Sequence, residues 1–130
     1  MKKIYLAINF HPDDSNKKLI EDISDALKRI DIEAYCMVRD YEKWGEIKLS
    51  PEECMQKAFE VIDSSDAVIV ELSEKGVGIG IEAGYAFAQN KPIIVIAKTG
   101  SDISSTLVGI AENVIFYDSV EELSEKVKVI

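Results

Sequence analysis

A glutamate, Glu82, stands among glycine and apolar residues in the segment GVGIGIEAGYAFAQNK, which runs from Gly76 to Lys91. Gly76, Gly78 and Gly80 lie on its N-terminal side and carry no side chain that would keep a ligand away from it. We expect a helix here, and the dipole of that helix would keep the carboxylate ionised, as a nucleophile must be. Such a carboxylate can attack an anomeric carbon and form a covalent glycosyl-enzyme intermediate. The alternative is a solvated first-turn glutamate that only the helix dipole favours.

Two other features of this segment bear on its role. The helix is apolar on nearly every side, so we expect it to be largely buried. Gly78, Gly80 and Ala83 also match GxGxxA, the pattern of dinucleotide-binding turns. That pattern normally follows the first strand and is succeeded by an acidic residue at the tip of the second. Here it follows a later strand, and the next strand ends in IAKTG, so a dinucleotide site is disfavoured. A phosphate cradle at the helix N-terminus stays open.

The segment RDYEKWGEIKLS, residues 39–50, is too long for a simple turn and carries several polar and aromatic side chains. Asp40, Glu42 and Glu46 are candidate proton donors to a leaving group. Tyr41 and Trp44 are candidates to stack on a planar base. The alternative is a solvated, mobile connection without a function.

Polar residues near the other predicted strand ends give weaker signals. Asn9 follows the first predicted strand and is a candidate ligand contact. The sole histidine, His11, precedes two carboxylates, but one histidine is weak evidence for a metal, and capping of the next helix by Asp13, Asp14 or Ser15 is favoured. We expect no metal site.

The elements that would position these residues alternate between strand and helix. We expect strands at 3–9, 32–38, 66–72, 92–97 and 113–117. We expect helices at 15–30 and at 50–65, where Ser50 is the N-cap and Pro51 the first helical residue. Further helices should include Glu82, lie near 103–111, and begin near 119. Alternation of this kind predicts a parallel sheet with helices on both faces. The expected fold is α/β and flavodoxin-like, a single domain over residues 1–130 with strand order 2-1-3-4-5, and ligands should bind at the carboxyl ends of strands 1 and 3.

Composition excludes several classes of function. The net charge is −9, which disfavours binding to nucleic-acid polymers or anionic membranes. No apolar run approaches the roughly 20 residues of a membrane span. Cys36 and Cys54 show no metal-binding spacing, so we expect reduced, buried thiols in a cytoplasmic protein.

The segment GVGIGIEAGYAFAQNKPIIVI resembles the signature of the nucleoside 2-deoxyribosyltransferases and the related 2'-deoxynucleoside 5'-phosphate N-hydrolases. The matching pattern is G-x-G-x-E-x-G-Y-A, and the resemblance extends to KIYLAIN, SSDAVIVEL and SSTLVGIAENVIFY. It implies a five-stranded α/β fold with Glu82 as the nucleophile on C1' of a ribosyl or deoxyribosyl group. It also implies that Tyr5, at the position of the family's strand-1 tyrosine, hydrogen-bonds this nucleophile. A core aromatic is the alternative for Tyr5.

The chain departs from this family at two positions. Ala58 stands where the family usually has an aspartate that assists the base or contacts the sugar. Gly76 stands where transferases carry aspartate and phosphate-recognising hydrolases carry serine. In the hydrolases a serine contacts the phosphate across a dimer interface, and Ser104 or Ser105 falls at that place here, with helix capping as the alternative.

We therefore expect an enzyme that cleaves the N-glycosidic bond of a nucleoside or nucleoside 5'-monophosphate, by hydrolysis more readily than by transfer. We expect no cofactor and a homodimer or larger homo-oligomer, as the resemblance implies. A non-catalytic nucleotide-binding or sensing module is the main alternative, and a flavodoxin-like FMN carrier is a third.

Overall fold

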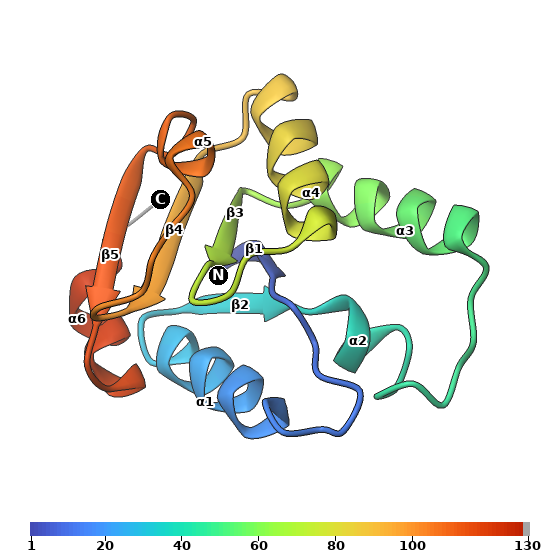
Figure 1. Cartoon of the computed structure of the whole chain (residues 1–130), viewed down its shortest axis with the longest axis horizontal. Coiled ribbons are helices and arrows are strands. Elements are labelled where there is room, and N and C mark those ends of the chain that lie inside the picture. The colour runs from blue at the N-terminus through green and yellow to red at the C-terminus, as the bar shows by residue number, and fades with distance from the viewer. Residues whose placement is uncertain (129–130) are drawn as a thin grey trace.

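The computed structural model describes residues 1–128 of the chain. Five parallel strands form one sheet in the order β2-β1-β3-β4-β5, which confirms the expected flavodoxin-like arrangement (Figure 1). The strands are β1 (Lys2–Ala7), β2 (Ile32–Tyr35), β3 (Ala67–Glu71), β4 (Ile93–Lys98) and β5 (Asn113–Tyr117).

Helices cover both faces of this sheet, with α1 on one side and α3 and α4 on the other (Figure 1). The helices are α1 (Lys17–Lys28), α2 (Met37–Asp40), α3 (Pro51–Asp63), α4 (Val77–Ala88), α5 (Ser105–Val108), the 3₁₀ helix η1 (Val120–Glu122) and α6 (Leu123–Lys126). No helix within residues 1–128 is both long enough and apolar enough to cross a membrane.

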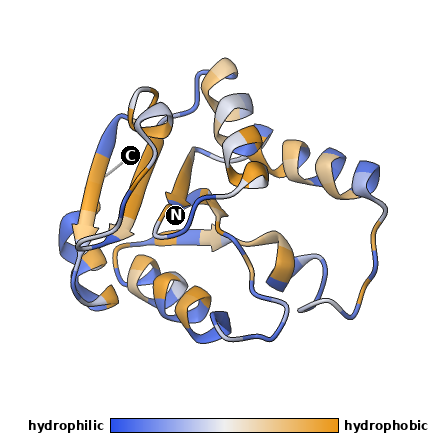
Figure 2. Ribbon diagram, viewed as in Figure 1, coloured by the Kyte–Doolittle hydropathy of each residue, from blue (hydrophilic) through white to orange (hydrophobic). Residues whose placement is uncertain are grey.

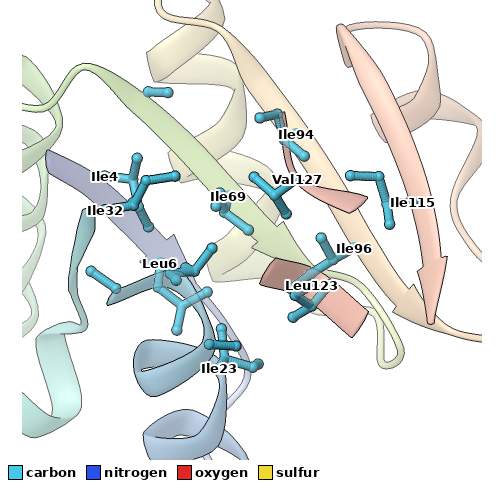
Figure 3. Packing of buried hydrophobic residues seen from close by; sticks show 14 of the residues in the cluster. Ile4, Leu6, Ile23, Ile32, Ile69, Ile94, Ile96, Ile115, Leu123 and Val127 are labelled. Carbon is cyan, nitrogen blue, oxygen red and sulfur yellow. The ribbon is translucent and has the colours of Figure 1, made fainter. Parts of the chain in front are cut away.

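The sheet divides the apolar interior into two clusters, and the hydropathy colouring shows that the strands between them are largely apolar (Figure 2). One cluster lies under α1 and α6, where Ile23 and Leu123 approach strand residues such as Ile69 and Ile96 (Figure 3). The other cluster lies under α3 and α4 and includes Tyr5. Burial of apolar surface on both sides stabilises the fold at roughly 25 cal/mol per Å².

Local chemistry defines the start of α3 as the sequence predicts. The Ser50 hydroxyl accepts the Glu53 N–H at 3.2 Å, and the Glu53 carboxylate accepts the Ser50 N–H at 3.1 Å. Pro51 follows as the first helical residue, where a missing N–H costs nothing. For α1 the predicted cap is wrong, because Asn16 and not Ser15 precedes the helix and no side chain caps it.

The second strand is shorter than its apolar pattern predicts. It ends at Tyr35, and the residues from Met37 to Asp40 form the short helix α2 instead of continuing the strand. The Asp40 carboxylate accepts the Cys36 N–H at 2.8 Å, and the Arg39 guanidinium binds the same carboxylate at 2.9 Å. These local hydrogen bonds take the place of further pairing with β1 and turn the chain out of the sheet.

The expectation that α4 is largely buried is wrong. Ile79, Ala83 and Ala86 are buried against the sheet. On the opposite side of the helix the exposed fractions are 82% for Val77, 49% for Ile81 and 55% for Phe87. The helix therefore presents an apolar face that no other described part of the chain covers.

Candidate active site

A tyrosine–glutamate pair joins the first strand to the fourth helix. The Tyr5 hydroxyl donates a hydrogen bond to the Glu82 carboxylate, and Tyr5 is buried whereas Glu82 is half-buried. Side chains alternate along β1, so Ile4 and Leu6 face α1 while Tyr5 faces α3 and α4. The contact that the resemblance implies between Tyr5 and Glu82 is therefore present.

Burial has a large effect on the Glu82 carboxyl group and raises its pKa from 4.5 to about 7. The hydrogen bond from Tyr5 lowers this pKa, and the charge of Glu42 raises it further. The expectation that the helix dipole keeps this group ionised is wrong, because burial raises the pKa of the Glu82 carboxyl. Because α4 begins at Val77, Glu82 lies in its second turn, where the dipole effect has faded.

The Tyr5 hydroxyl is a permanent donor in this pair. Burial raises its pKa far above the usual value, and the nearby charge of Glu82 raises it further. The phenol therefore stays protonated over the whole range in which proteins are stable. It can hold the Glu82 carboxylate in one orientation without exchanging its own proton.

Asn9 and Gly76 meet where β1 and the loop after β3 end. The Asn9 amide donates to the Lys75 carbonyl at 2.7 Å. A Cβ atom at position 76 would lie 2.2 Å from the Asn9 Oδ1 atom, so the glycine makes room for this amide. The structure thus brings together two of the expected substrate contacts, and the Asn9 side chain occupies space that a serine or aspartate at position 76 would need.

The other two glycines lie on different sides of α4. Gly78 is one turn before Glu82, and the side chain of a helical residue leans over the turn that precedes it. The absence of a side chain at Gly78 therefore leaves the approach to Glu82 open, and a Cβ there would meet nothing within 4 Å. Gly80 is two residues before Glu82, about 200° around the helix, so it belongs to a different face.

Two candidates in the segment after β2 are already engaged elsewhere. Asp40 binds Arg39 and the Cys36 N–H, so it is tied to the end of β2 and is not free to donate a proton. Trp44 packs against Phe10 with ring centres 5.8 Å apart, and the Lys17 ammonium lies 4.6 Å from the centre of its ring. It belongs to the cluster under α1, on the other face of the sheet from Tyr5, so the expected stacking on a base is not supported.

The hydroxyl groups before α5 have a structural role within one chain. Ser104 is the N-cap of α5, and its hydroxyl accepts the Leu107 N–H at 3.4 Å. This confirms the capping alternative for Ser104. Ser105 is exposed, and no hydrogen bond of its side chain is seen among residues 1–128.

Sequence reasoning missed a polar cavity of about 360 Å³ beside the site. Its lining includes Asn9, His11, Ser15 and Glu74, but not Glu82. The His11 Nδ1 atom lies 2.6 Å from the Ser15 hydroxyl, and its Nε2 atom lies 2.5 Å from a Glu74 carboxylate oxygen. These bonds connect the loop after β1 to the loop after β3. Only the position of both loops at strand ends hinted at this contact.

Cys54 was expected to be a buried thiol, and this is wrong because it is half-buried. It lies one helical turn before Ala58, on the same side of α3, and packs against the cluster that contains Tyr5. Burial raises the pKa of its thiol, as do the charges of Glu42 and Glu82. In the sequence, the four-residue spacing between Cys54 and Ala58 was the feature that could have placed this thiol on the same side of the predicted helix as Ala58. Within residues 1–128 no group of three His, Cys, Asp or Glu side chains has a geometry that would hold a metal ion.

Comparison with known proteins relates this geometry to a family. The family model described as Nucleoside 2-deoxyribosyltransferase matches residues 4–122. The protein named "Putative 2'-deoxynucleoside 5'-phosphate N-hydrolase 1" from Thermofilum pendens (strain DSM 2475 / Hrk 5) is 25% identical over 137 residues, which cover 95% of this chain and 91% of that protein.

Two solved structures share the fold. A CMP N-glycosidase from Clostridium botulinum is 24% identical with a TM-score of 0.69, and the match covers 96% of each chain. A 2-deoxyribosyltransferase from Bacillus psychrosaccharolyticus is 14% identical with a TM-score of 0.74, and the match covers 96% of this chain and 92% of that one. Because the family model spans nearly the whole chain, this protein belongs to the nucleoside 2-deoxyribosyltransferase family and is an enzyme of that type.

Proposed function

We propose that the protein hydrolyses the N-glycosidic bond of a nucleoside or nucleoside 5'-monophosphate through a covalent bond between Glu82 and C1' of the sugar. The observation that carries this proposal is the hydrogen bond from buried Tyr5 to half-buried Glu82, in a helix where Gly78, one turn before Glu82, carries no side chain. Membership of the family supports cleavage or transfer at such a bond.

In this mechanism Glu82 attacks C1' as the bond to the base nitrogen breaks. Tyr5 holds the attacking carboxylate in place, and Gly78 leaves room for the sugar above it. Asn9 and the backbone at Gly76 meet just before the start of α4, and we propose that they bind the sugar or its 5' substituent. Water then attacks C1' and releases the carboxylate. Retaining glycosidases use the same two-step chemistry.

We prefer hydrolysis to base transfer because two positions of the site, Ala58 and Gly76, carry no carboxylate. Ala58 is buried and apolar at the place where a carboxylate would assist a nucleobase. Gly76 carries no carboxylate either. The relative from Thermofilum pendens, whose printed name is that of an N-hydrolase, supports this choice.

Release of free base from a panel of nucleosides and their 5'-monophosphates, measured by chromatography, tests this proposal. We expect release by the native chain, no release by Glu82→Ala, and no increase when an acceptor base is added. Mass spectrometry of the Glu82 peptide after acid quenching should detect the sugar bound to this residue. Absence of base release from every member of the panel would overturn the proposal.

The second candidate is a non-catalytic nucleotide-binding module of the same fold. The observation that favours it is that buried, apolar Ala58 offers no proton at the position where a carboxylate would assist a nucleobase. Calorimetry separates the two candidates, because a binding module would bind a nucleotide tightly and leave it intact for hours. A substrate of the proposed enzyme would be consumed.

A homo-oligomer is part of the proposal, with the apolar face of α4 as its interface. Val77, Ile81 and Phe87 are exposed on this face, and Gly80 and Gly84 would allow another helix to approach closely. Sedimentation should show a dimer or larger assembly that Phe87→Asp converts to a monomer. Phe116→Asp, at an exposed phenylalanine of β5, is the matched control. A native chain that is monomeric at high concentration would contradict this part.

A further inference from the structure

The first turn of α4 has few side chains that could hold it against the sheet. Its N-cap and two of its first four residues are glycines, and the Val77 side chain is 82% exposed. Ile79 is the one buried side chain of this turn. The glycines that leave room beside Glu82 therefore also remove packing that would fix the helix on which Glu82 lies. Hydrogen bonds from the loop after β1 take the place of this packing.

Asn9, in the loop after β1, binds the backbone at the start of α4. Its side chain donates to the Lys75 carbonyl at 2.7 Å, and its Oδ1 atom lies so close to Gly76 that a Cβ atom there would be 2.2 Å away. Lys75 and Gly76 are the two residues that precede the helix. One segment of chain thus contacts α4 at two levels, because Tyr5 binds Glu82 in the second turn and Asn9, four residues after Tyr5, binds the helix start.

Asn9 is held in turn by a buried asparagine at the start of α1. Asn16 is 7% exposed, and its Nδ2 group donates to the Asn9 carbonyl at 2.6 Å. Its Oδ1 atom accepts the His11 N–H at 3.0 Å. An asparagine that precedes a helix usually caps it, but the Asn16 side chain makes no capping bond to α1. Both ends of this amide are used to fix the loop that carries Asn9.

A second link between the same two loops is weaker. The His11 Nε2 atom lies 2.5 Å from a Glu74 carboxylate oxygen, and the exposed fractions of the two side chains are 35% and 55%. Pairs exposed to this degree contribute little, because water screens their charges. Hydrogen bonds of a buried amide cost more to lose, since the groups left behind have no water to replace the partner. The bonds of Asn16 are therefore the stronger of the two ties.

We propose that Asn16 is a positioning residue for Glu82, an inference that rests on the function proposed above for its effect on rate. Asn16 fixes Asn9, and Asn9 holds the start of α4. The hydrogen-bonded helix then presents the Glu82 carboxylate to the Tyr5 hydroxyl. A misplacement of about 1 Å in such a contact can lower the rate about 10²-fold. Asn16 does not touch the reacting atoms and acts only through Asn9.

An isosteric change at Asn16 tests this role. Asn16→Asp keeps the Oδ1 acceptor for the His11 N–H, but it replaces the donor to the Asn9 carbonyl with a carboxylate oxygen, which that carbonyl repels. Proton NMR can observe the Tyr5 hydroxyl, whose exchange with water is slow while the group is buried and bonded to Glu82. We expect this signal in the native chain and its loss or upfield shift in Asn16→Asp. Tyr5→Phe identifies the signal by its absence.

Two variants serve as matched controls. Asn90→Asp makes the same substitution at an exposed residue beyond the other end of α4, where φ is positive and both residue types are acceptable. Glu74→Ala removes the exposed link between the loops. Both controls should keep the native Tyr5 signal. Asn16→Ala, which removes both hydrogen bonds of the amide, is a second test variant, and circular dichroism checks that each variant is folded.

Kinetics separate alignment of the Tyr5–Glu82 pair from a general effect on the protein. On the substrate that the native chain cleaves fastest, we expect Asn16→Asp to lower kcat by up to about 10²-fold. In a Tyr5→Phe background the same change should lower kcat much less, because the contact that Asn16 aligns is already lost. Equal falls in the two backgrounds would show that Asn16 does not act through this pair.

The outcomes distinguish this inference from the proposed function. A native Tyr5 signal in both Asn16 variants, or a lost signal without a fall in kcat, overturns the inference and leaves the proposed function intact. If the native chain cleaves no nucleoside or nucleotide, the proposed function fails, and the NMR result still decides whether Asn16 aligns the pair. A native chain without the Tyr5 signal would contradict the contact itself and, with it, both proposals.

Discussion

The carboxyl group of Glu82 is subject to two opposing influences. Burial disfavours its charge, while the hydrogen bond from Tyr5 favours it, and the balance places its pKa at about 7. A nucleophile near this value is ionised in about half of the molecules at neutral pH. The site therefore combines an attacking group that is weakly solvated, and so reactive, with a donor that limits the loss of its charge.

This balance predicts a pH dependence. Because only ionised Glu82 attacks, the rate on a good leaving group should rise as the pH increases through about 7. Tyr5→Phe removes an influence that lowers this pKa, so the rise should move to higher pH and the rate at neutral pH should fall about 10–100-fold. Tyr85→Phe is the control, since it also loses a hydrogen bond to a carboxylate, but the carboxylate is that of Asp63. An unchanged profile in Tyr5→Phe would show that the hydrogen bond is unimportant.

The contact between Asn9 and Gly76 predicts the result of a double-mutant cycle that measures the free energy of unfolding. The backbone at Gly76 is extended, so alanine is acceptable there except for its contact with Asn9. Gly76→Ala should displace the Asn9 amide from the Lys75 carbonyl and cost about 1 kcal/mol in the free energy of unfolding. In an Asn9→Ala background the same change should cost almost nothing, and urea denaturation of the four proteins measures the difference. Equal costs in both backgrounds would contradict the contact.

Several site residues could be predicted and others could not, for a physical reason. Glu82 and Tyr5 are marked by a motif and by a strand position, which depend only on local sequence. The roles of Asp40 and Trp44 depend on the path of the chain after β2, where Lys43, Trp44 and Gly45 all have positive φ. Nothing in the residue types of Lys43 and Trp44 favours that conformation. The direction of the chain at this point, and with it the position of the Trp44 ring, could therefore not be predicted.

At the scale of helices and strands, elements with a local sequence signature were predictable, whereas an element whose conformation depends on tertiary contacts was not. The Ser50–Glu53 capping box and the apolar runs of the central strands identify α3, β3 and β4 from sequence alone. The apolar run from Ile32 to Val38 fits a strand or a helix equally well. Hydrogen bonds to the Asp40 side chain decide the outcome, and such bonds have no periodic signature.

The structural role of Asp40 yields a test of its own. Asp40→Ala removes the acceptor for the Cys36 N–H and the partner of Arg39, both half-buried or buried. We expect a loss of about 1–3 kcal/mol in the free energy of unfolding, measured by urea denaturation. The kcat of the folded fraction should stay near that of the native chain. A fall in kcat without a loss of stability would instead assign Asp40 to the reaction.

For the whole molecule, the buried carboxyl of Glu82 links stability to pH. The folded chain keeps this group protonated up to a pH of about 7, whereas the unfolded chain releases the proton near 4.5. The folded state binds more protons between these values, so the free energy of unfolding falls as the pH rises through them. Glu82→Gln, which still accepts from Tyr5, should be more stable than the native chain by about 1–3 kcal/mol near pH 8. The two should converge below about pH 4. Equal stability at both pH values would contradict a destabilised carboxylate.

The division of the interior by the sheet has a consequence for how sequence change is tolerated. The cluster under α1 and α6 contains no member of the Tyr5–Glu82 pair, whereas the cluster under α3 and α4 contains Tyr5. Substitutions such as Ile23→Val would lower the amount of folded protein while each folded molecule keeps its turnover. Substitutions such as Ala58→Ser would alter turnover or substrate choice directly. Selection for abundance and selection for specificity can therefore act on opposite faces of one sheet, and a new substrate preference can arise on one face while the other is left unchanged.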